Sequence, residues 1–379
     1  MRLLFVSQDF PPVRGGIQTY AGELATRFAA WSDAFVVIAP DHPRAAAYDA
    51  GLPFDVCRVA TSSDLFPLTA VPHVRRLARE HRLDAAFSTQ WSSGLAVHLA
   101  RRYGGPSRLF VAAHGREVLF EPERLPRFVR SAYDRMRRRV FGSAERLFPV
   151  SGYTAGLLHA AGVPADRTTV ITNGADPGRF SPIDASPLRE RLDLNGHAVI
   201  LSVCRLVPRK GIDTTLRALP GVMRDVPHVR YLIVGDGPDR PRLQALAQSL
   251  GVEEHVRFIP GIDNDELPHF YNVADVVSMP SRSDPPDVEG FGIVFLEANA
   301  CEKPVVGART GGIPDAIRHG ETGLLIEPDD VDALASSIVR LLTAPEYARQ
   351  LGRQGRERVV KEATWDTIAE RMFAAMHAE

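Results

Sequence analysis

Short apolar runs alternate with segments of helical periodicity along the whole chain. The first half contains seven runs typical of strands, namely LLFVSQ, FVVIAP, FDVCRVA, AAFSTQ, RLFVAAHG, RLFPVS and TTVITNG. Helical patterns follow Gly16, Pro67, Trp91 and Ser151. Strands that are apolar throughout and separated by helices predict a parallel sheet covered by helices on both faces.

A Pro- and Asp-rich segment, NGADPGRFSPIDASPLRERL, interrupts this alternation, which then restarts. The second half adds the runs AVILSVCRL, VRYLIVGDG, VRFIPG, VVSMPS, PVVGAR and TGLLIEP. We therefore predict an α/β protein with two doubly wound domains, at residues 1–178 and 184–360, joined by this linker. Open α/β sheets bind ligands beyond the carboxyl ends of their strands, so we expect the site in the cleft between the domains.

Length and composition agree with this organisation and exclude several classes of protein. The 379 residues exceed one ordinary core, and 45 basic against 46 acidic residues argue against a polyanionic partner. No apolar run is long enough to cross a bilayer, and the N-terminus lacks the features of a signal peptide. Cys57, Cys204 and Cys301 are isolated, as in a reducing compartment, so we expect a cytoplasmic protein.

The segment SRSDPPDVEGFGIVFLEA, at residues 281–298, has the most informative chemistry. Glu289 precedes a predicted apolar helix, and Glu297 lies about a turn and a half inside it. Unpaired amides at a helix start attract anions and polar oxygens. Those expected here belong to Gly290, Phe291, Gly292 and Ile293. Carboxylates that accept from hydroxyls, beside amides that donate to oxygens, suit a sugar nucleotide.

Three other strand-end positions are candidate ligand contacts. Gly15 and Gly16 open the first helix, where glycine allows a phosphate to approach, although a tight turn explains an isolated Gly-Gly equally well. His114 ends the run RLFVAAHG. Arg205 and Lys210 follow AVILSV, where two cations could neutralise a diphosphate, although this spacing is common by accident. Neither a G-x-G-x-x-G fingerprint nor a Walker A lysine is present.

The segment ERLPRFVRSAYDRMRRRV, at residues 123–140, predicts a basic amphipathic helix. Its apolar stripe is Leu125, Phe128 or Val129, Ala132, Met136 and Val140. The rest of its surface is predicted to carry Arg124, Arg127, Arg130, Arg135, Arg137, Arg138 and Arg139. Such a helix could contact an anionic membrane, or it could be a solvated helix that packs on its own domain.

Asp263 and Asp265 have the D-x-D spacing of metal-dependent transferases. They fall just before the helical run ELPHFY, where Asp is a common cap. We interpret them as capping residues and expect no metal.

Together these motifs resemble the retaining glycosyltransferases of family 4, whose GT-B fold has two facing Rossmann-like domains. The matching segments, in the family's order, are RGG, AHG, NGAD, SVCRLVPRKG, LIVGDGP, EGFGIVFLE and TGGIPDAI. The spacing of Glu289 and Glu297 is the family's signature. QDFPPVRGGIQTY, AHGREV, CRLVPRKG and DVEGFGIVFLEA look most like actinobacterial GDP-mannose-dependent phosphatidylinositol mannosyltransferases.

The resemblance implies a role for each candidate residue. It implies catalytic roles for His114, Arg205, Lys210 and Glu289. It implies sugar contacts for Glu289, Gly290, Phe291 and Gly292. It implies nucleotide or diphosphate contacts for Gly15, Gly16, Arg205, Lys210, Ile262, Asp263, Ile293 and Glu297. It also implies that a last helix, at residues 364–379, packs back on the first domain.

The resulting expectation is retaining transfer of a hexose, with mannose from GDP-mannose favoured, to a hydroxyl of a lipid or glycolipid. Carboxylates at residues 263 and 265 could accept from guanine, and Arg205 and Lys210 could replace a metal. The enzyme would then be cytoplasmic, or peripheral on the inner face of the plasma membrane. The alternatives are a UDP-sugar donor with a soluble or polysaccharide-precursor acceptor, a GT-B sugar-nucleotide 2-epimerase, and a non-catalytic binder of sugar nucleotides.

Overall fold

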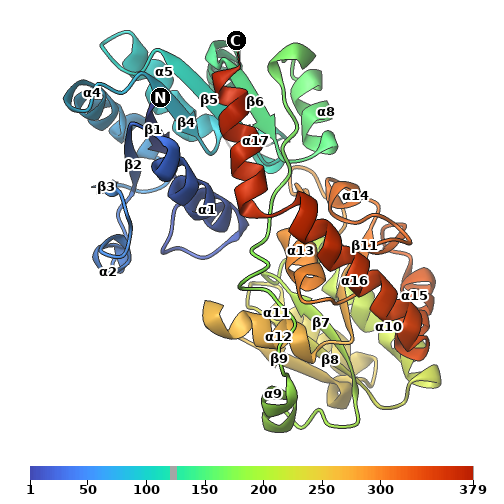
Figure 1. Cartoon of the computed structure of the whole chain (residues 1–379). Helices are drawn as coiled ribbons and strands as arrows, with labels where there is room; N and C mark the ends of the chain where they lie inside the picture. The colour runs from blue at the N-terminus through green and yellow to red at the C-terminus, as the bar shows by residue number, and fades with distance from the viewer. Residues whose placement is uncertain (120–125, 379) are drawn as a thin grey trace. The chain divides into compact units, whose positions relative to one another are not determined.

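The chain folds into two compact units (Figure 1). The computed structural model describes residues 1–119 and 126–378. Unit 1 comprises Met1–Asn173 and the residues from Trp365 onward, and unit 2 comprises Gly174–Thr364. The sequence pattern placed the end of the first domain at residue 178, whereas the contacts place it at Asn173.

Unit 1 is built on a parallel six-stranded sheet with the order β3-β2-β1-β4-β5-β6. Its strands are β1 (Arg2–Val6), β2 (Ala34–Pro40), β3 (Asp55–Val59), β4 (Ala85–Ser88), β5 (Arg108–Ala113) and β6 (Arg146–Pro149). The strand order reverses between β1 and β4, where Leu4 lies opposite Ala86. A reversal of this kind leaves a crevice beyond the carboxyl ends of the two strands.

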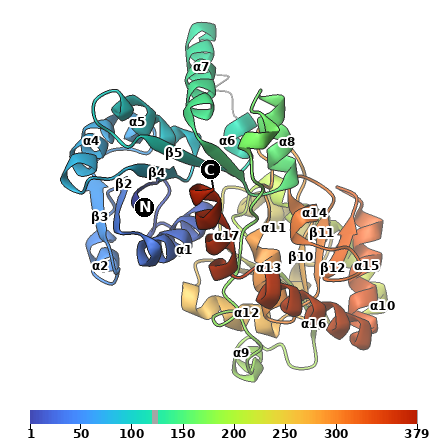
Figure 2. The same cartoon turned by 45° about the horizontal axis from the view of Figure 1, so that its top comes forward.

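Helices cover both faces of this sheet (Figure 2). They are α1 (Gly16–Trp31), α2 (Ala45–Asp49), α3 (Phe66–Thr69), α4 (Val71–Glu80), α5 (Trp91–Arg101), α6 (Arg116–Leu119), α7 (Arg127–Ser143), α8 (Gly152–Ala160) and α17 (Trp365–His377). Leu4 of β1 joins the apolar cluster of α4, α5 and α7, and the ring of Phe5 packs against that of Phe28 of α1. Alternate residues of one strand therefore enter two cores, which explains why the strands are apolar throughout.

The last helix, α17, packs against α1 within unit 1. Phe373 packs against Phe28 with tilted rings whose centroids are 5.5 Å apart, and Asp366 pairs with Arg27 at 2.6 Å. The end of the chain therefore completes one face of the unit in which the chain begins.

Unit 2 repeats the same topology in the order β12-β11-β10-β7-β8-β9. Its strands are β7 (Ala198–Val203), β8 (Val229–Val234), β9 (Val256–Ile259), β10 (Val276–Met279), β11 (Val305–Ala308) and β12 (Gly323–Ile326). The reversal lies between β7 and β10, where Ile200 is opposite Val276. The crevice of unit 2 is therefore expected beyond the ends of β7 and β10.

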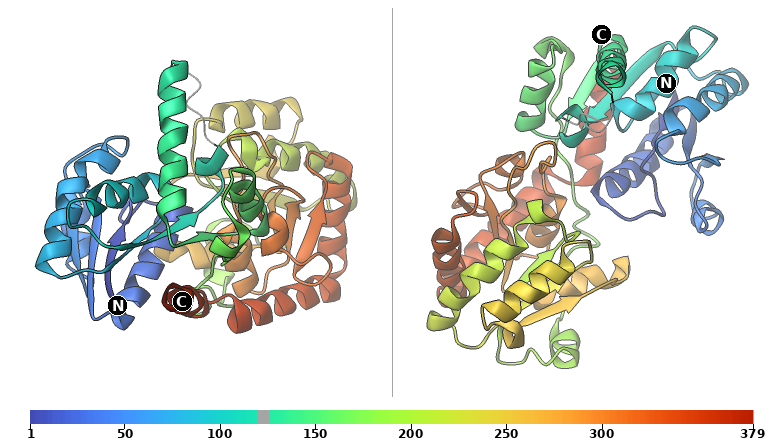
Figure 3. Two further views of the ribbon diagram at one scale, coloured as in Figure 1. Left: turned by 90° about the horizontal axis from the view of Figure 1, so that it is seen from above. Right: turned by 180° about the vertical axis from the view of Figure 1, so that it is seen from behind.

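Helices also cover both faces of the second sheet, and Figure 3, right, shows the face with α10 and α11. The helices of unit 2 are α9 (Ser186–Arg191), α10 (Ile212–Asp225), α11 (Arg240–Ser249), α12 (Leu267–Val273), α13 (Ile293–Ala300), α14 (Ile313–Ala316), α15 (Val331–Thr343) and α16 (Pro345–Glu362). Helix α15 packs on α10 and α16 packs on α13.

One predicted strand is wrong. The run TTVITNG, at residues 168–174, is irregular apart from an isolated bridge between Thr168 and Leu147. Its β-branched residues favour an extended backbone, but only two of its amides bond to β6, those of Thr169 and Ile171. The other predicted strands are confirmed.

The composition of the Pro- and Asp-rich segment predicted a linker, but this segment is partly helical and bonded to unit 2. Its second half contains the helix α9. Its first half is held by unit 2, because Ala175 donates to the carbonyl of Ala363 and Asn272 bonds to both Ile183 and Ser181. Proline and aspartate therefore mark a surface segment of unit 2 here.

The basic segment forms α7, but its predicted faces are partly wrong. The helix stands out from unit 1 (Figure 3, left). Phe128 is 75% exposed, whereas Val140 is buried, so the predicted apolar stripe faces the core only in its C-terminal half. Arg137 is buried and donates to the carbonyl of Val118 at 2.5 Å and to Asp134 at 2.7 Å, because it lies on the side that faces the core. Residues 123–125 of the predicted helix lie outside the described residues, and within the described ranges no helix is long and apolar enough to span a membrane.

Candidate functional site

Glu289 lies where the segment after β10 meets the loop after β7. Its side chain is 12% exposed, and its Oε2 lies 2.5 Å from Lys210 Nζ and 2.7 Å from Arg209 Nη1. Burial alone would raise the pKa of Glu289, but the charges and hydrogen bonds of Lys210 and Arg209 outweigh burial and lower the pKa to about 2. The structure thus brings together two predicted residues, Glu289 and Lys210, as an ion pair.

Arg205, which was expected beside Lys210, lies elsewhere on the loop after β7. Its side chain is exposed and forms no ion pair with any residue in the described ranges. Arg209 takes the place beside Lys210 instead, within the short 3-10 turn Pro208–Lys210. Arg205 therefore has a free guanidinium, whereas the charges of Arg209 and Lys210 are engaged by Glu289.

The backbone around Glu289 is held by the TGG motif at residues 310–312. The amide of Gly312 donates to the carbonyl of Glu289 at 2.9 Å. Gly311 has φ 54°, and a Cβ there would lie 2.2 Å from the same carbonyl oxygen. Only glycine allows the two backbones to approach this closely, so this motif positions Glu289.

The helix start that follows Glu289 has the predicted free amides. Gly292 is the N-cap of α13 with φ 96°, and Phe291 is buried. Within the part of the chain that the structure describes, no hydrogen bond uses the amides of residues 290–293. Phe291 can thus reach a ligand only through its backbone, because its side chain belongs to the core.

Glu297 points from α13 to Tyr271 of α12. Tyr271 is buried and donates its hydroxyl to Glu297 Oε2 at 2.6 Å. Burial raises the pKa of Glu297, and the hydrogen bond from Tyr271 and the charge of Arg179 oppose this shift. One carboxylate oxygen is thus engaged by the protein, and Oε1 has a remaining capacity to accept.

The loop at residues 262–265 and the Glu297 carboxylate share one neighbour, Arg179. Arg179, whose charge acts on Glu297, donates to the carbonyl of Asn264 at 2.7 Å. Asp263 is the N-cap of the 3-10 turn Asn264–Glu266, which leads into α12, although its side chain forms no capping bond. Among the described residues, no three His, Cys, Asp or Glu side chains form a group that could hold a metal ion.

A second polar cluster lies at the strand-order reversal of unit 1. Asp9 follows β1 and accepts from Gln90 after β4 and from Gln18 of α1, both at 2.8 Å. Burial raises the pKa of Asp9, whereas the bond from Gln90 and the neighbouring His114 oppose the rise. The amide of Gly16, the first residue of α1, donates to no other described residue.

His114 follows β5 beside this cluster. Its Nε2 donates to the carbonyl of Thr89 at 3.0 Å, its amide donates to Glu117 at 2.5 Å, and the Tyr20 ring packs edge-on at 4.8 Å. Loss of solvation lowers the pKa of His114 to about 4, although Thr89 and Asp9 favour the charged form. The imidazole is therefore neutral at pH 7, with Nε2 protonated and Nδ1 able to accept.

Comparison with known proteins identifies the family of the chain. The profile described as Glycosyl transferase 4-like domain matches residues 15–174, and the profile described as Glycosyl transferases group 1 matches residues 186–358. The chain is 37% identical to the GDP-mannose-dependent alpha-(1-6)-phosphatidylinositol monomannoside mannosyltransferase of Mycobacterium tuberculosis, over 98% of this chain and 97% of the relative. The chain belongs to the group 1 glycosyl transferases.

This glycosyltransferase has a further relative in Corynebacterium glutamicum. That protein, a GDP-mannose-dependent monoacylated alpha-(1-6)-phosphatidylinositol monomannoside mannosyltransferase, is 31% identical over 100% of this chain and 98% of its own. Among solved structures, the sucrose-phosphate synthase of Thermosynechococcus elongatus superposes with a TM-score of 0.83 at 24% identity, covering 100% of this chain and 98% of that one. The predicted GT-B fold is thereby confirmed.

Several residues of both clusters were not predicted from the sequence. Asp9 and Gln90 follow β1 and β4, so a predicted strand order would have placed them together. Arg209 precedes Lys210 in the same basic pair, but only the fold shows that both reach Glu289. No local pattern in the sequence points to Tyr271 as the partner of Glu297.

We predict that the His114 imidazole titrates near pH 4, far below its usual range. The unfolded chain binds this proton near pH 6.5, the ordinary value, so the contribution of His114 to the free energy of unfolding is present above that pH and is lost as the pH falls toward 4. Histidine NMR spectra of the wild type and of His114→Asn identify the resonance. A midpoint above pH 6 for that resonance would contradict the assignment of a ring that is neutral at pH 7.

Proposed function

We propose that this glycosyltransferase transfers mannose from GDP-mannose, with retention of configuration, to a hydroxyl of a phosphatidylinositol mannoside. The observation that carries the proposal is the similarity, over nearly the whole chain, to relatives whose names state this donor and this class of acceptor. The geometry of unit 2 supports it, since carboxylates, cations and free amides gather beyond the ends of β7 and β10.

The donor roles follow from which atoms are engaged and which are free. Glu297 Oε1 would accept from the ribose, because Oε2 already accepts from Tyr271. Glu289 and the amides of residues 290–292 would bind the sugar hydroxyls. Ile262 and Asp263 would contact the base, whose N–H groups a carboxylate suits.

Cationic side chains would bind and neutralise the diphosphate. Arg205 is exposed and free, and Lys210 can reorient from Glu289 to a phosphate because its stem is flexible. The amides of Gly16 and Ile293 would add neutral donors, and Gly15 would let the phosphate approach. These groups would stabilise the negative charge that grows on the leaving group, and no metal is needed for that step.

Transfer would then proceed on one face of the sugar. The bond from the anomeric carbon to the phosphate oxygen breaks, the acceptor oxygen forms the new bond, and its proton passes to the leaving phosphate. His114, neutral at pH 7, would bind a sugar hydroxyl through Nδ1. Glu289 would not act as a nucleophile, since it binds the sugar hydroxyls and Arg209 still holds its carboxylate when Lys210 turns to the phosphate.

We further propose that α7 contacts the anionic surface in which the lipid acceptor lies. The helix stands out from unit 1, and Phe128 near its start is 75% exposed. Arg135, Arg138 and Arg139 are also exposed. Each arginine near an anionic surface contributes about 1 kcal/mol of attraction, and an exposed aromatic ring can enter the headgroup layer.

The donor is tested by the thermal stability of the protein with GDP, UDP and ADP and with their sugars. A ligand that binds only the folded state raises the melting temperature, so GDP and GDP-mannose are expected to give the largest rise, in EDTA as well as in Mg²⁺. A larger rise of the melting temperature with UDP or ADP would contradict GDP-mannose as the donor and indicate a sugar of that nucleotide.

The different roles proposed for Glu289 and Glu297 are tested by alanine substitution. Glu289→Ala is expected to lower kcat by about 100-fold, because a contact to the reacting sugar is lost, and to leave GDP affinity unchanged or tighter. Glu297→Ala is expected to weaken GDP binding by about 10-fold or more. Glu321→Ala, which breaks an exposed ion pair with Arg318, is the matched control. Equal loss of GDP affinity in both variants would contradict the assigned roles.

The membrane proposal is tested with vesicles of phosphatidylcholine, with and without phosphatidylinositol. Changing Arg135, Arg138 and Arg139 together to Gln is expected to reduce binding to the anionic vesicles by roughly 100-fold, from the loss of about 3 kcal/mol. The control changes three exposed arginines of unit 2, Arg217, Arg224 and Arg353, to Gln. If both triple variants bind equally well, α7 is a solvated helix.

A further inference from the structure

The segment from Pro280 to Glu289 connects β10 to the helix start of the donor site, and both of its ends are fixed. At its beginning, Gly211 has φ 68°, and a Cβ there would lie 2.0 Å from the Pro280 carbonyl oxygen. At its end, the Glu289 carbonyl accepts from Gly312. The contacts of the part between these ends determine how the segment lies against α10 and against Arg209, which faces the Glu289 carboxylate.

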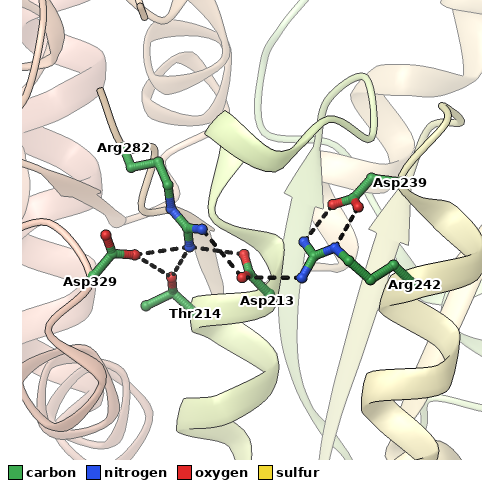
Figure 4. A network of polar contacts seen from close by, with 6 residues as sticks. All are labelled: Asp213, Thr214, Asp239, Arg242, Arg282 and Asp329. Atoms are coloured by element: carbon green, nitrogen blue, oxygen red, sulfur yellow. Dashed lines mark hydrogen bonds and ion pairs between the residues drawn. The ribbon is translucent and has the colours of Figure 1, made fainter. Parts of the chain in front are cut away.

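Arg282 holds this intermediate part against the first turn of α10 (Figure 4). Its guanidinium forms a fork with Asp213, with Nη2 at 2.9 Å from Oδ1 and Nη1 at 3.3 Å from Oδ2. Nη2 also donates to Thr214 Oγ1 at 2.8 Å and lies 2.9 Å from Asp329 Oδ1. A planar fork that meets acceptors on three residues fixes the orientation of the arginine as well as its position.

Asp213 needs the contact with Arg282, because its side chain is only 9% exposed. A buried carboxylate requires a partner charge. Its other cation, Arg242, lies 3.5 Å away and is mainly engaged by Asp239 at 2.6 Å. Figure 4 shows the two arginines on opposite sides of Asp213. Arg282 is thus the close partner of this acid, and Arg242 the distant one.

The backbone of Arg282 connects this network to the reacting end of the site. Its amide donates to the carbonyl of Arg209 at 2.8 Å, and Arg209 contacts Glu289 at 2.7 Å. The side chain of Arg282 therefore anchors the segment after β10 to α10. Its backbone amide holds Arg209, which contacts Glu289. Both routes place the carboxylate relative to Lys210.

We propose that Arg282 is a positioning residue for sugar transfer, which sets the location of Glu289 through Asp213 and Arg209 without touching the substrate. This inference rests on the proposed role of Glu289 at the donor sugar. A displacement of about 1 Å at a reacting centre can cost about 100-fold in rate, so a defined anchor affects kcat more than nucleotide affinity.

The test compares Arg282→Gln with Arg242→Gln, which removes the distant partner of the same acid and leaves the fork intact. Arg282→Gln is expected to lower kcat by about 10- to 100-fold with the Kd for GDP within about two-fold of wild type. Arg282→Lys, which keeps the charge without the fork, is expected to recover part of the lost kcat. Arg242→Gln is expected to keep wild-type kcat. Wild-type kcat in Arg282→Gln, or an equal loss in Arg242→Gln, overturns the proposal.

The assay uses the nucleotide sugar that wild-type enzyme turns over, so failure of GDP-mannose as donor is recognised separately from failure of this inference. Where Arg282→Gln does not fold, Thr214→Val removes one acceptor of the same guanidinium without changing side-chain shape. Its kcat is expected to fall about two- to five-fold with GDP affinity unchanged. A wild-type kcat in Thr214→Val, or a loss of GDP affinity in proportion to kcat, then overturns the proposal.

Discussion

A buried carboxylate must have a partner charge, and Glu289 meets this requirement with two cations from another loop. Lys210 and Arg209 follow β7, whereas Glu289 follows the segment after β10. The two loops meet because β7 and β10 are neighbours at the point where the strand order reverses. The ion pair therefore depends on the topology of the sheet, whereas the backbone beside it is held by Gly312, whose amide donates to the Glu289 carbonyl.

The same topological constraint acts in unit 1 with different chemistry. There the residues beyond the reversal are Asp9 and Gln90, and His114 follows the next strand. Unit 1 thus contributes a half-buried carboxylate and a neutral imidazole, which suit hydroxyl groups. Unit 2 contributes cations, two glutamates and a helix start, which suit a sugar nucleotide. One fold, used twice, carries these two kinds of chemistry because the residues that follow its strands differ between the two units.

Most of the fold followed from the pattern of apolar residues, and the exceptions have physical causes. Continuous apolar strands indicated sheets covered on both faces, and alternate residues such as Leu4 and Phe5 do enter opposite cores. TTVITNG had the same composition but lies beside β6 with only two ladder hydrogen bonds, which no local pattern reveals. Arg137 was expected at the surface and is buried, because helical spacing assigns a face without showing what that face meets.

The sequence by itself determined the class of fold, the presence of two domains and the residue types at the ends of the strands. It placed Glu289 before a helix and Lys210 after a strand, since both positions depend on local spacing. Only the tertiary structure decided that these side chains meet, across 79 residues of chain, and that Arg209 rather than Arg205 joins them. It also decided that Tyr271 engages Glu297 and that Arg282 anchors the approach to Glu289. Local spacing fixes which residues lie at strand ends, but only the order of the strands fixes which ends are neighbours.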